Sequence, residues 1–196
     1  VLPDSKLTQS KRAALHRLIT ASMGIHVQAR AENSYLTPGE AVALQVELVN
    51  RSPVGATLSS LEARLFDSDQ WPRSIALERI DNLNKSLESD LVEVVELAFS
   101  LPVDAPLTQP FWLKTPPDTA IYHFENERLL ELENVPAPIE VIAELEIEGR
   151  TIPLSVPGIE RVSDPIKGEV HKIVAIRPEL VLAADSAVTL FEDTQS

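Results

Sequence analysis

The sequence contains no cysteine and only six glycines among its 196 residues. The absence of cysteine excludes disulfides and thiolate chemistry, and the scarcity of glycine argues against a loop that cradles phosphate. No apolar run approaches the roughly 18 residues that a membrane-spanning helix needs. Residues 1–4 have neither the basic nor the apolar region of a signal peptide. The single methionine is Met23, so we expect an excised piece or a processed product of a longer protein.

Motifs of common enzyme sites are also lacking. There is no GxSxG nucleophile motif. Asp67 and Asp69 offer oxygen ligands of the kind calcium prefers, but the rest of an EF-hand loop is missing, which favours a solvated turn. The histidines are too widely spaced for an HxxH or HExxH zinc motif; they are His16, His26, His123 and His171. We predict no catalytic residue, no metal site and no cofactor.

Charge is distributed unevenly along the chain. The formal net charge is −13, yet residues 1–30 contain five basic residues and one acidic residue. An acidic body repels phosphate backbones, so we do not expect nucleic-acid binding. The basic leading segment has two interpretations: a solvated helix face, or a surface that docks on an acidic neighbour.

Residues 7–22 have the pattern of a short amphipathic helix. Leu15, Leu18 and Ile19 fall at helical spacing, and basic side chains occupy the other side. Gly24 suits the left-handed position just after the helix. Because an isolated helix of this length is marginal in water, we expect the Leu15/Leu18/Ile19 stripe to pack against another surface.

From residue 25 onward the hydrophobic period changes to two, which predicts strands with one buried face. The alternation places Glu62 on the solvent side and breaks near Ser59-Ser60 and Val94-Val95, where we predict bulges. The clearest hairpin turns at residues 148–150. The predicted strands are 25–30, 42–48, 61–65, 95–99, 139–147, 152–156, 170–177 and 179–183, with a short one at 187–191.

The same alternation predicts the hydrophobic core. Its members point to one side of their strands, and two sheets bury such faces against each other. The predicted core is Val42, Leu44, Val46, Leu48, Leu61, Leu65, Leu97, Phe99, Val141, Leu145, Ile152 and Leu154.

Residues 101–138 differ from the rest, since they hold seven of the fifteen prolines. Proline at this density excludes a long helix and disfavours a central strand, so we predict a long connection or a domain joint. The segment is also the richest in aromatic residues, which would either stack on sugar rings or seal the joint against the sheets. The candidate glycan or interdomain contacts are Phe111, Trp112, Tyr122 and Phe124.

Many short strands with little helix predict an all-β fold, an Ig-like antiparallel β-sandwich, one large or two small, led by one short N-terminal helix. We divide the chain into a helical segment at 1–23 and an Ig-like β-sandwich at 24–125. Residues 126–196 form a second β-rich subdomain or continue the sandwich.

Three stretches together carry a family resemblance. They are NSYLTPGE at 33–40 with VNRSP at 49–53, LPVDAP at 101–106 with QPFWL at 109–113, and SDPIKGE at 163–169 with RPE at 177–179. In this order they resemble the region downstream of the catalytic domain in large bacterial PIG-L (LmbE-like) de-N-acetylases. The first stretch is also similar to the Ig-like sandwich associated with carbohydrate-binding modules of some glycosidases. The resemblance covers roughly residues 7–182.

The catalytic part of that family carries a His-Pro-Asp-Asp-type motif and a His-x-x-His pair, and neither occurs here. The resemblance therefore implies a non-catalytic accessory module of an exported, extracytoplasmic bacterial deacetylase or other carbohydrate-active enzyme. Its partners would be adjacent domains of the parent protein and glycan. The alternative is a structural or adhesion-type Ig-like module of a surface protein. A self-contained hydrolase would need a catalytic constellation that the sequence lacks.

Overall fold

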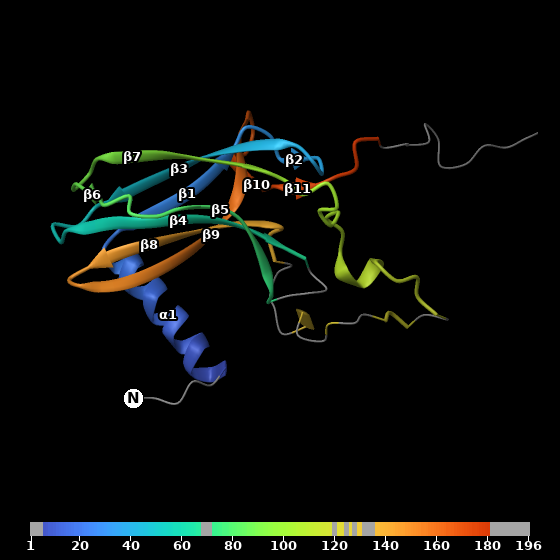
Figure 1. Cartoon of the computed structure of the whole chain (residues 1–196), viewed down its shortest axis with the longest axis horizontal. Helices are drawn as coiled ribbons and strands as arrows, with labels where there is room; N and C mark the ends of the chain where they lie inside the picture. The colour runs from blue at the N-terminus through green and yellow to red at the C-terminus, as the bar shows by residue number, and fades with distance from the viewer. Residues whose placement is uncertain are drawn as a thin grey trace, which may run out of the picture.

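The computed structural model describes residues 6–67, 72–118, 121–123, 126, 129–130 and 136–180. These residues form a mainly β structure with one α-helix (Figure 1), as predicted. The elements are α1 (Lys6–Ser22), β1 (Ile25–Ala31), β2 (Tyr35–Leu36), β3 (Ala41–Asn50), β4 (Ala56–Phe66), β5 (Ser74–Ile80), β6 (Lys85–Leu87), β7 (Val92–Ser100), the 3-10 helix η1 (Phe111–Leu113), β8 (Ile139–Ile147), β9 (Arg150–Asp164), β10 (Gly168–Ile173) and β11 (Ala175–Ile176).

Nine strands belong to one strongly curved sheet in the order β5-β4-β8-β9-β1-β3-β7, with β10 beside β9 and β6 beside β4. The sheet folds over on itself, so that β1, β3 and β7 lie opposite β4 and β8 (Figure 1). Because its strands form a nearly closed, barrel-like sheet, the structure confirms the mainly β class but does not confirm an Ig-like sandwich. The remaining strands, β2 and β11, form a small parallel pair.

The long strand β9 connects the two layers. Its first part, residues 150–157, pairs with β8, and residues 159–164 pair with β10. Between them, Gly158 and Ile159 pair with β1 in parallel. Pro157 and Gly158 lie where β9 passes from one layer to the other. Proline has no amide hydrogen to donate to a neighbouring strand and glycine has no side chain, and both properties suit a strand that leaves one layer for the other.

The core lies between the layers and confirms the predicted alternation. Of the twelve predicted core residues, eleven are buried, and Leu154 is partly buried and packs against the others. The predicted β8–β9 hairpin is also confirmed. Glu148 and Gly149 both have positive φ, 48° and 73°, as a two-residue type I′ turn requires.

Other local predictions had mixed outcomes. The β4–β8 register shifts between Leu58 and Ser60, which confirms the first bulge. The predicted bulge near Val94-Val95 is wrong, because β3 and β7 pair without interruption from Ala41–Ser100 to Val49–Val92. Strand β5, which has no clear alternation, was missed. The predicted strand at 170–177 is replaced by two strands, β10 and β11. In the predicted strand at 179–183, residues 179–180 are not in a strand. The rest of that strand and the predicted strand at 187–191 lie outside the described residues.

Helix α1 has the predicted extent but a different orientation. Ile19 and Met23 pack on the core and Thr20 is buried, whereas Leu15 is 53% exposed and Leu18 65%. Of the Leu15/Leu18/Ile19 stripe, Ile19 therefore packs on the body, whereas the body does not cover Leu15 and Leu18. Thr20 can face the sheet because its hydroxyl donates to the carbonyls of His16 or Arg17 within the helix, at 3.1 Å each. No helix in the described residues is long and apolar enough to cross a membrane.

Candidate functional site

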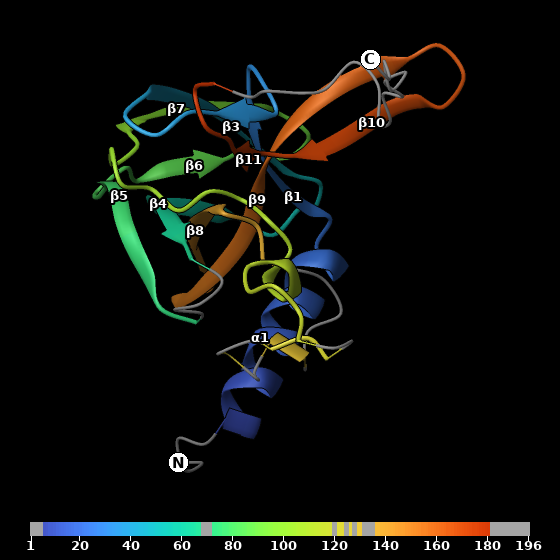
Figure 2. The ribbon, with the colours of Figure 1, turned by 90° about the vertical axis from the view of Figure 1, so that its right-hand side faces the viewer.

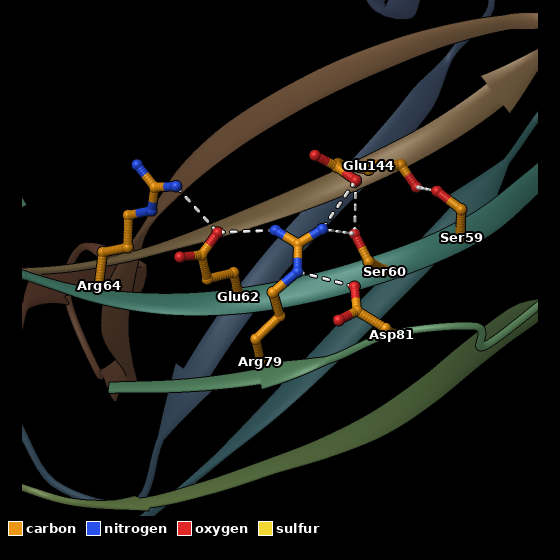
Figure 3. Close-up of polar contacts among 7 residues, drawn as sticks. All are labelled: Ser59, Ser60, Glu62, Arg64, Arg79, Asp81 and Glu144. Carbon is orange, nitrogen blue, oxygen red and sulfur yellow. Dashed lines mark hydrogen bonds and ion pairs between the residues drawn. The ribbon is translucent and has the colours of Figure 1, made fainter. Parts of the chain in front are cut away.

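A cluster of charged side chains covers the outer face of β4, β5 and β8 (Figure 3). Alternation along β4 directs Ser60, Glu62 and Arg64 to this face. The sheet register then brings Arg79 of β5 opposite Glu62, and Glu144 of β8 opposite Ser60. Two consecutive strands, β4 and β5, and the much later strand β8 therefore supply one charged cluster.

Arg79 is the hub of this cluster. Its Nη1 donates to Glu62 Oε2 at 2.9 Å and its Nε to Asp81 Oδ1 at 2.7 Å. Its Nη2 reaches Glu144 Oε2 at 3.2 Å, and that carboxylate also accepts a 2.7 Å bond from the Ser60 hydroxyl. All three nitrogens of the guanidinium are engaged, so it holds the edge strand β5 on β4 and β8.

Glu62 contradicts the prediction that it faces solvent. It is 6% exposed, because Arg64 and Arg79 lie over it and each donates to its Oε2 at 2.9 Å. The hydrogen bond from Arg64 is the main cause of a lowered pKa for Glu62, although burial opposes the shift. The pKa of Arg79 is raised, chiefly by its hydrogen bond to Asp81. Because Glu62 and Arg79 are both held in their charged forms, the cluster is better suited to joining strands than to transferring protons.

The predicted aromatic residues lie on a separate part of the surface. Phe111 and Trp112 belong to η1 and meet edge to face, with ring centroids 5.0 Å apart and planes at 86°. Trp112 is 40% exposed and Tyr122 is 50% exposed. Phe124 lies outside the described residues. The structure thus brings two of the four predicted contacts together and leaves Trp112 partly exposed.

This aromatic segment is anchored next to a cavity. Lys114 Nζ pairs with Asp67 Oδ1 at 3.1 Å, and the Ile176 amide donates to the Thr108 hydroxyl at 2.8 Å. Asp67 also lines a cavity of about 440 Å³ at the end of β4 and β5. The cavity combines apolar walls with carboxylate, guanidinium and hydroxyl groups; its lining is Leu65, Asp67, Arg73, Ser74, Ile75, Asp104 and Pro106.

A second cavity, of about 430 Å³, lies between α1 and the outer face of β8 and β9. The helix contributes Arg12, Ala13, His16 and Arg17. The sheet contributes Ile142, Pro153, Leu154 and Ser155. One wall is therefore basic and the other largely apolar.

In the described ranges, no group of three or more His, Asp or Glu side chains could hold a metal ion. His171 instead contacts Glu169, with 2.8 Å between Nε2 and Oε1, and this hydrogen bond is the main cause of a lowered pKa for Glu169.

Sequence reasoning missed the Arg79 cluster entirely. Glu62 and Arg64 are two residues apart on one strand, but Arg79 and Asp81 come from a region where no strand was predicted, and Glu144 lies 65 residues after Arg79. The only signal in the sequence was the alternation along β8, which gave the face of Glu144 but not its partner.

No family model matches this chain, and no curated protein matches it. The solved structures with partial similarity to this chain include the following two. The sporulation control protein Spo0M from Bacillus subtilis is 14% identical with a TM-score of 0.39, covering 78% of this chain and 49% of that one. The Pseudomonas fluorescens alkylpurine DNA glycosylase AlkC, bound to DNA containing an abasic site analog, is 10% identical with a TM-score of 0.33, covering 78% and 35%.

This chain thus spans about half of the first of these proteins and about a third of the second. At these scores neither similarity supports an inference about fold or function. The resemblance to PIG-L de-N-acetylases stays a prediction.

Proposed function

We propose that this chain is a non-catalytic accessory module, an Ig-like β-sandwich, of a multidomain, exported bacterial PIG-L-like deacetylase or other carbohydrate-active enzyme. In this role it packs on the catalytic domain or helps to position glycan substrate. The observation that carries the proposal is the anchored Phe111–Trp112 pair, with Trp112 exposed, next to the cavity lined by Asp67.

Two properties of this surface support the proposal. Phe111 and Trp112 meet edge to face, and Trp112 stays 40% exposed in this contact. Aromatic faces combine a large apolar area with low conformational freedom, which suits contact with a sugar ring or a neighbouring domain. The adjacent cavity supplies carboxylates, a guanidinium and a hydroxyl, which can bond to sugar hydroxyls while its apolar walls cover the ring.

The glycan branch is tested by titrating the chain with oligosaccharides of N-acetylglucosamine and following tryptophan fluorescence and calorimetry. We expect Trp112→Ala to weaken binding by roughly tenfold or more, as truncation of an anchoring aromatic does. Tyr35→Ala is the matched control, because Tyr35 is an exposed aromatic already covered by the guanidinium of Arg177 at 3.4 Å. Equal affinity for Trp112→Ala and the wild type would remove the aromatic pair from the proposal.

The parent enzyme is tested by reading the gene upstream of Val1. A metal-dependent deacetylase signature there would support the proposal. A surface protein with repeated sandwich modules would favour the alternative, a structural or adhesion-type module. The β9–β10 hairpin favours that alternative, since it projects from the body (Figure 2) and carries Ile166, 94% exposed, at its tip.

A further inference from the structure

In the described residues, helix α1 packs on the core through its C-terminal end, and a cavity lies between Arg12, Ala13, His16 and Arg17 of the helix and strands β8 and β9. Ile19, Thr20 and Met23 contact the sheet, and the preceding turns extend away from it (Figures 1 and 2). Leu15 and Leu18 are more than half exposed on these free turns. Isolated helices of this length are marginal in water, so these turns would gain stability from a partner that covers them.

The free turns also carry unpaired positive charge. The sequence of α1 contains no Asp or Glu. Across the described residues, no carboxylate pairs with the side chains of Lys11, Arg12 or Arg17. Elsewhere, six basic residues pair with carboxylates: Arg30, Arg64, Arg79, Lys85, Lys114 and Arg161. In a chain of net charge −13, α1 is thus a basic element that its own acidic body does not neutralise.

We propose that α1 docks on an acidic surface of the domain adjacent to this module. Leu15 and Leu18 enter an apolar depression of that surface, and Lys11, Arg12 and Arg17 pair with carboxylates around it. The cavity beside α1 places Ile142 of β8 next to Arg12 and Arg17 of the helix, so the same partner can contact it. This inference rests on the proposed function, because it names the element and the partner chemistry of the interdomain contact.

Charge and area favour this partner over the other candidates. A second α1 would bring like charges together, without a carboxylate on either helix. An anionic membrane would repel the acidic body, and two leucines bury too little apolar surface for stable membrane binding. The acidic body would also repel a nucleic acid, and phosphate groups would contact the cations of α1 but not the leucines between them.

The test uses the full chain and the polypeptide encoded immediately upstream of Val1, with affinity measured by calorimetry. Leu15→Gln/Leu18→Gln removes the apolar contact but keeps good helix formers, and Arg12→Glu/Arg17→Glu reverses the charge. We expect each double variant to weaken binding by at least about tenfold, and wild-type binding to weaken as salt rises. The control Ile166→Gln/Lys172→Glu changes an exposed isoleucine and a cation on the β9–β10 hairpin, and its affinity should stay within about twofold of wild type.

Hydrogen exchange gives a second readout on the same samples. Amides of residues 11–18 should become protected when the upstream polypeptide is added. Binding that is unchanged in both α1 variants would overturn the inference while leaving the accessory module standing. No binding by the wild type would overturn this inference and the domain-packing branch of the proposed function, and would leave the glycan branch to its own titration. Dimerisation of this chain alone, or binding to anionic vesicles, would also overturn the inference if the α1 variants abolished it.

Discussion

Glu62 is buried on a face that would otherwise be open to water, because two arginines lie over it. A buried carboxylate loses its hydration and must recover that free energy from charged donors. Arg64 and Arg79 supply them, and Asp81 and Glu144 in turn offset the charge of Arg79. The cluster therefore depends on all of its members being present.

Replacing Glu62 with glutamine should lower the free energy of unfolding by about 1–3 kcal/mol, because a neutral amide leaves two arginines with a weaker acceptor. Urea denaturation measures the change. Glu146→Gln is the matched control, since Glu146 is an exposed glutamate on the same strand, β8, and it should shift stability by less than about 0.5 kcal/mol. Equal effects of the two changes would show that the cluster adds nothing to stability.

The same carboxylate makes stability depend on pH. The pKa of Glu62 is lower in the folded chain than its ordinary value of 4.5. Its contribution is thus complete above pH 4.5 and is lost as the pH falls through the folded pKa. We expect the stability gap between wild type and Glu62→Gln to narrow below pH 4.5. Urea midpoints measured from pH 7 to pH 3 check this; a gap that is constant or widens would contradict the lowered pKa.

Gly24 joins α1 to β1 in a conformation that other residues avoid. Its φ is +63°, and an added Cβ would lie 3.0 Å from the Cβ of Arg51, which cannot rotate away. Gly24→Ala should therefore cost about 1–3 kcal/mol. Gly55→Ala is the matched control, because φ there is not positive and no atom lies within 4 Å of the new Cβ. Thermal denaturation gives the unfolding midpoint of each variant. An unchanged midpoint for Gly24→Ala would show that the backbone between α1 and β1 adjusts to the added Cβ without cost.

At the scale of the element, the alternation of β8 divides its residues between core and surface. Leu145 is fully buried and pairs with Ile152 across the hairpin, while Glu144 and Glu146 point outward. The period of two thus places every second side chain in the core. A shift of the pairing register by one residue would turn the buried side chains to solvent and the glutamates to the core.

Truncating Leu145 to alanine should lower the free energy of unfolding by about 2–5 kcal/mol, since it removes apolar contacts and leaves a cavity. Leu18→Ala is the matched control, because Leu18 is an exposed leucine on α1 and alanine favours helix. Chemical denaturation should show a change within about 0.5 kcal/mol for that control. A loss below about 1 kcal/mol for Leu145→Ala would mean that the core packs differently.

At the scale of the whole molecule, β9 belongs to both layers. It pairs with β8 on one side of the fold and with β1 and β10 on the other, so neither layer keeps its strand order without it. The sheet combines strands from residues 24–125 and from residues 126–196.

We therefore expect a single cooperative unfolding transition for the full chain. Calorimetry should give equal calorimetric and van't Hoff enthalpies, as it does for small domains that share one core. Two separated transitions would show that residues 24–125 and 126–196 unfold independently, despite the shared strand.

Much of the local structure was predictable from the sequence. Helical spacing gave the extent of α1, alternation gave β3 and β8, and the turn at Glu148 and Gly149 gave the hairpin. These features depend on neighbours a few residues apart, so the pattern of apolar and polar residues contains them. The buried set followed, because a strand with one apolar face has only one side that can pack.

The tertiary structure alone decided which strands pair, where β9 changes layers, how α1 is oriented and why Glu62 is buried. Each of these depends on residues far apart in the chain, such as Glu62, Arg79 and Glu144, or Gly24 and Arg51. An alternating strand specifies a buried face but not the strand beside it. Pairing partners are chosen by the packing and charge of the whole assembly, which no single segment of sequence encodes.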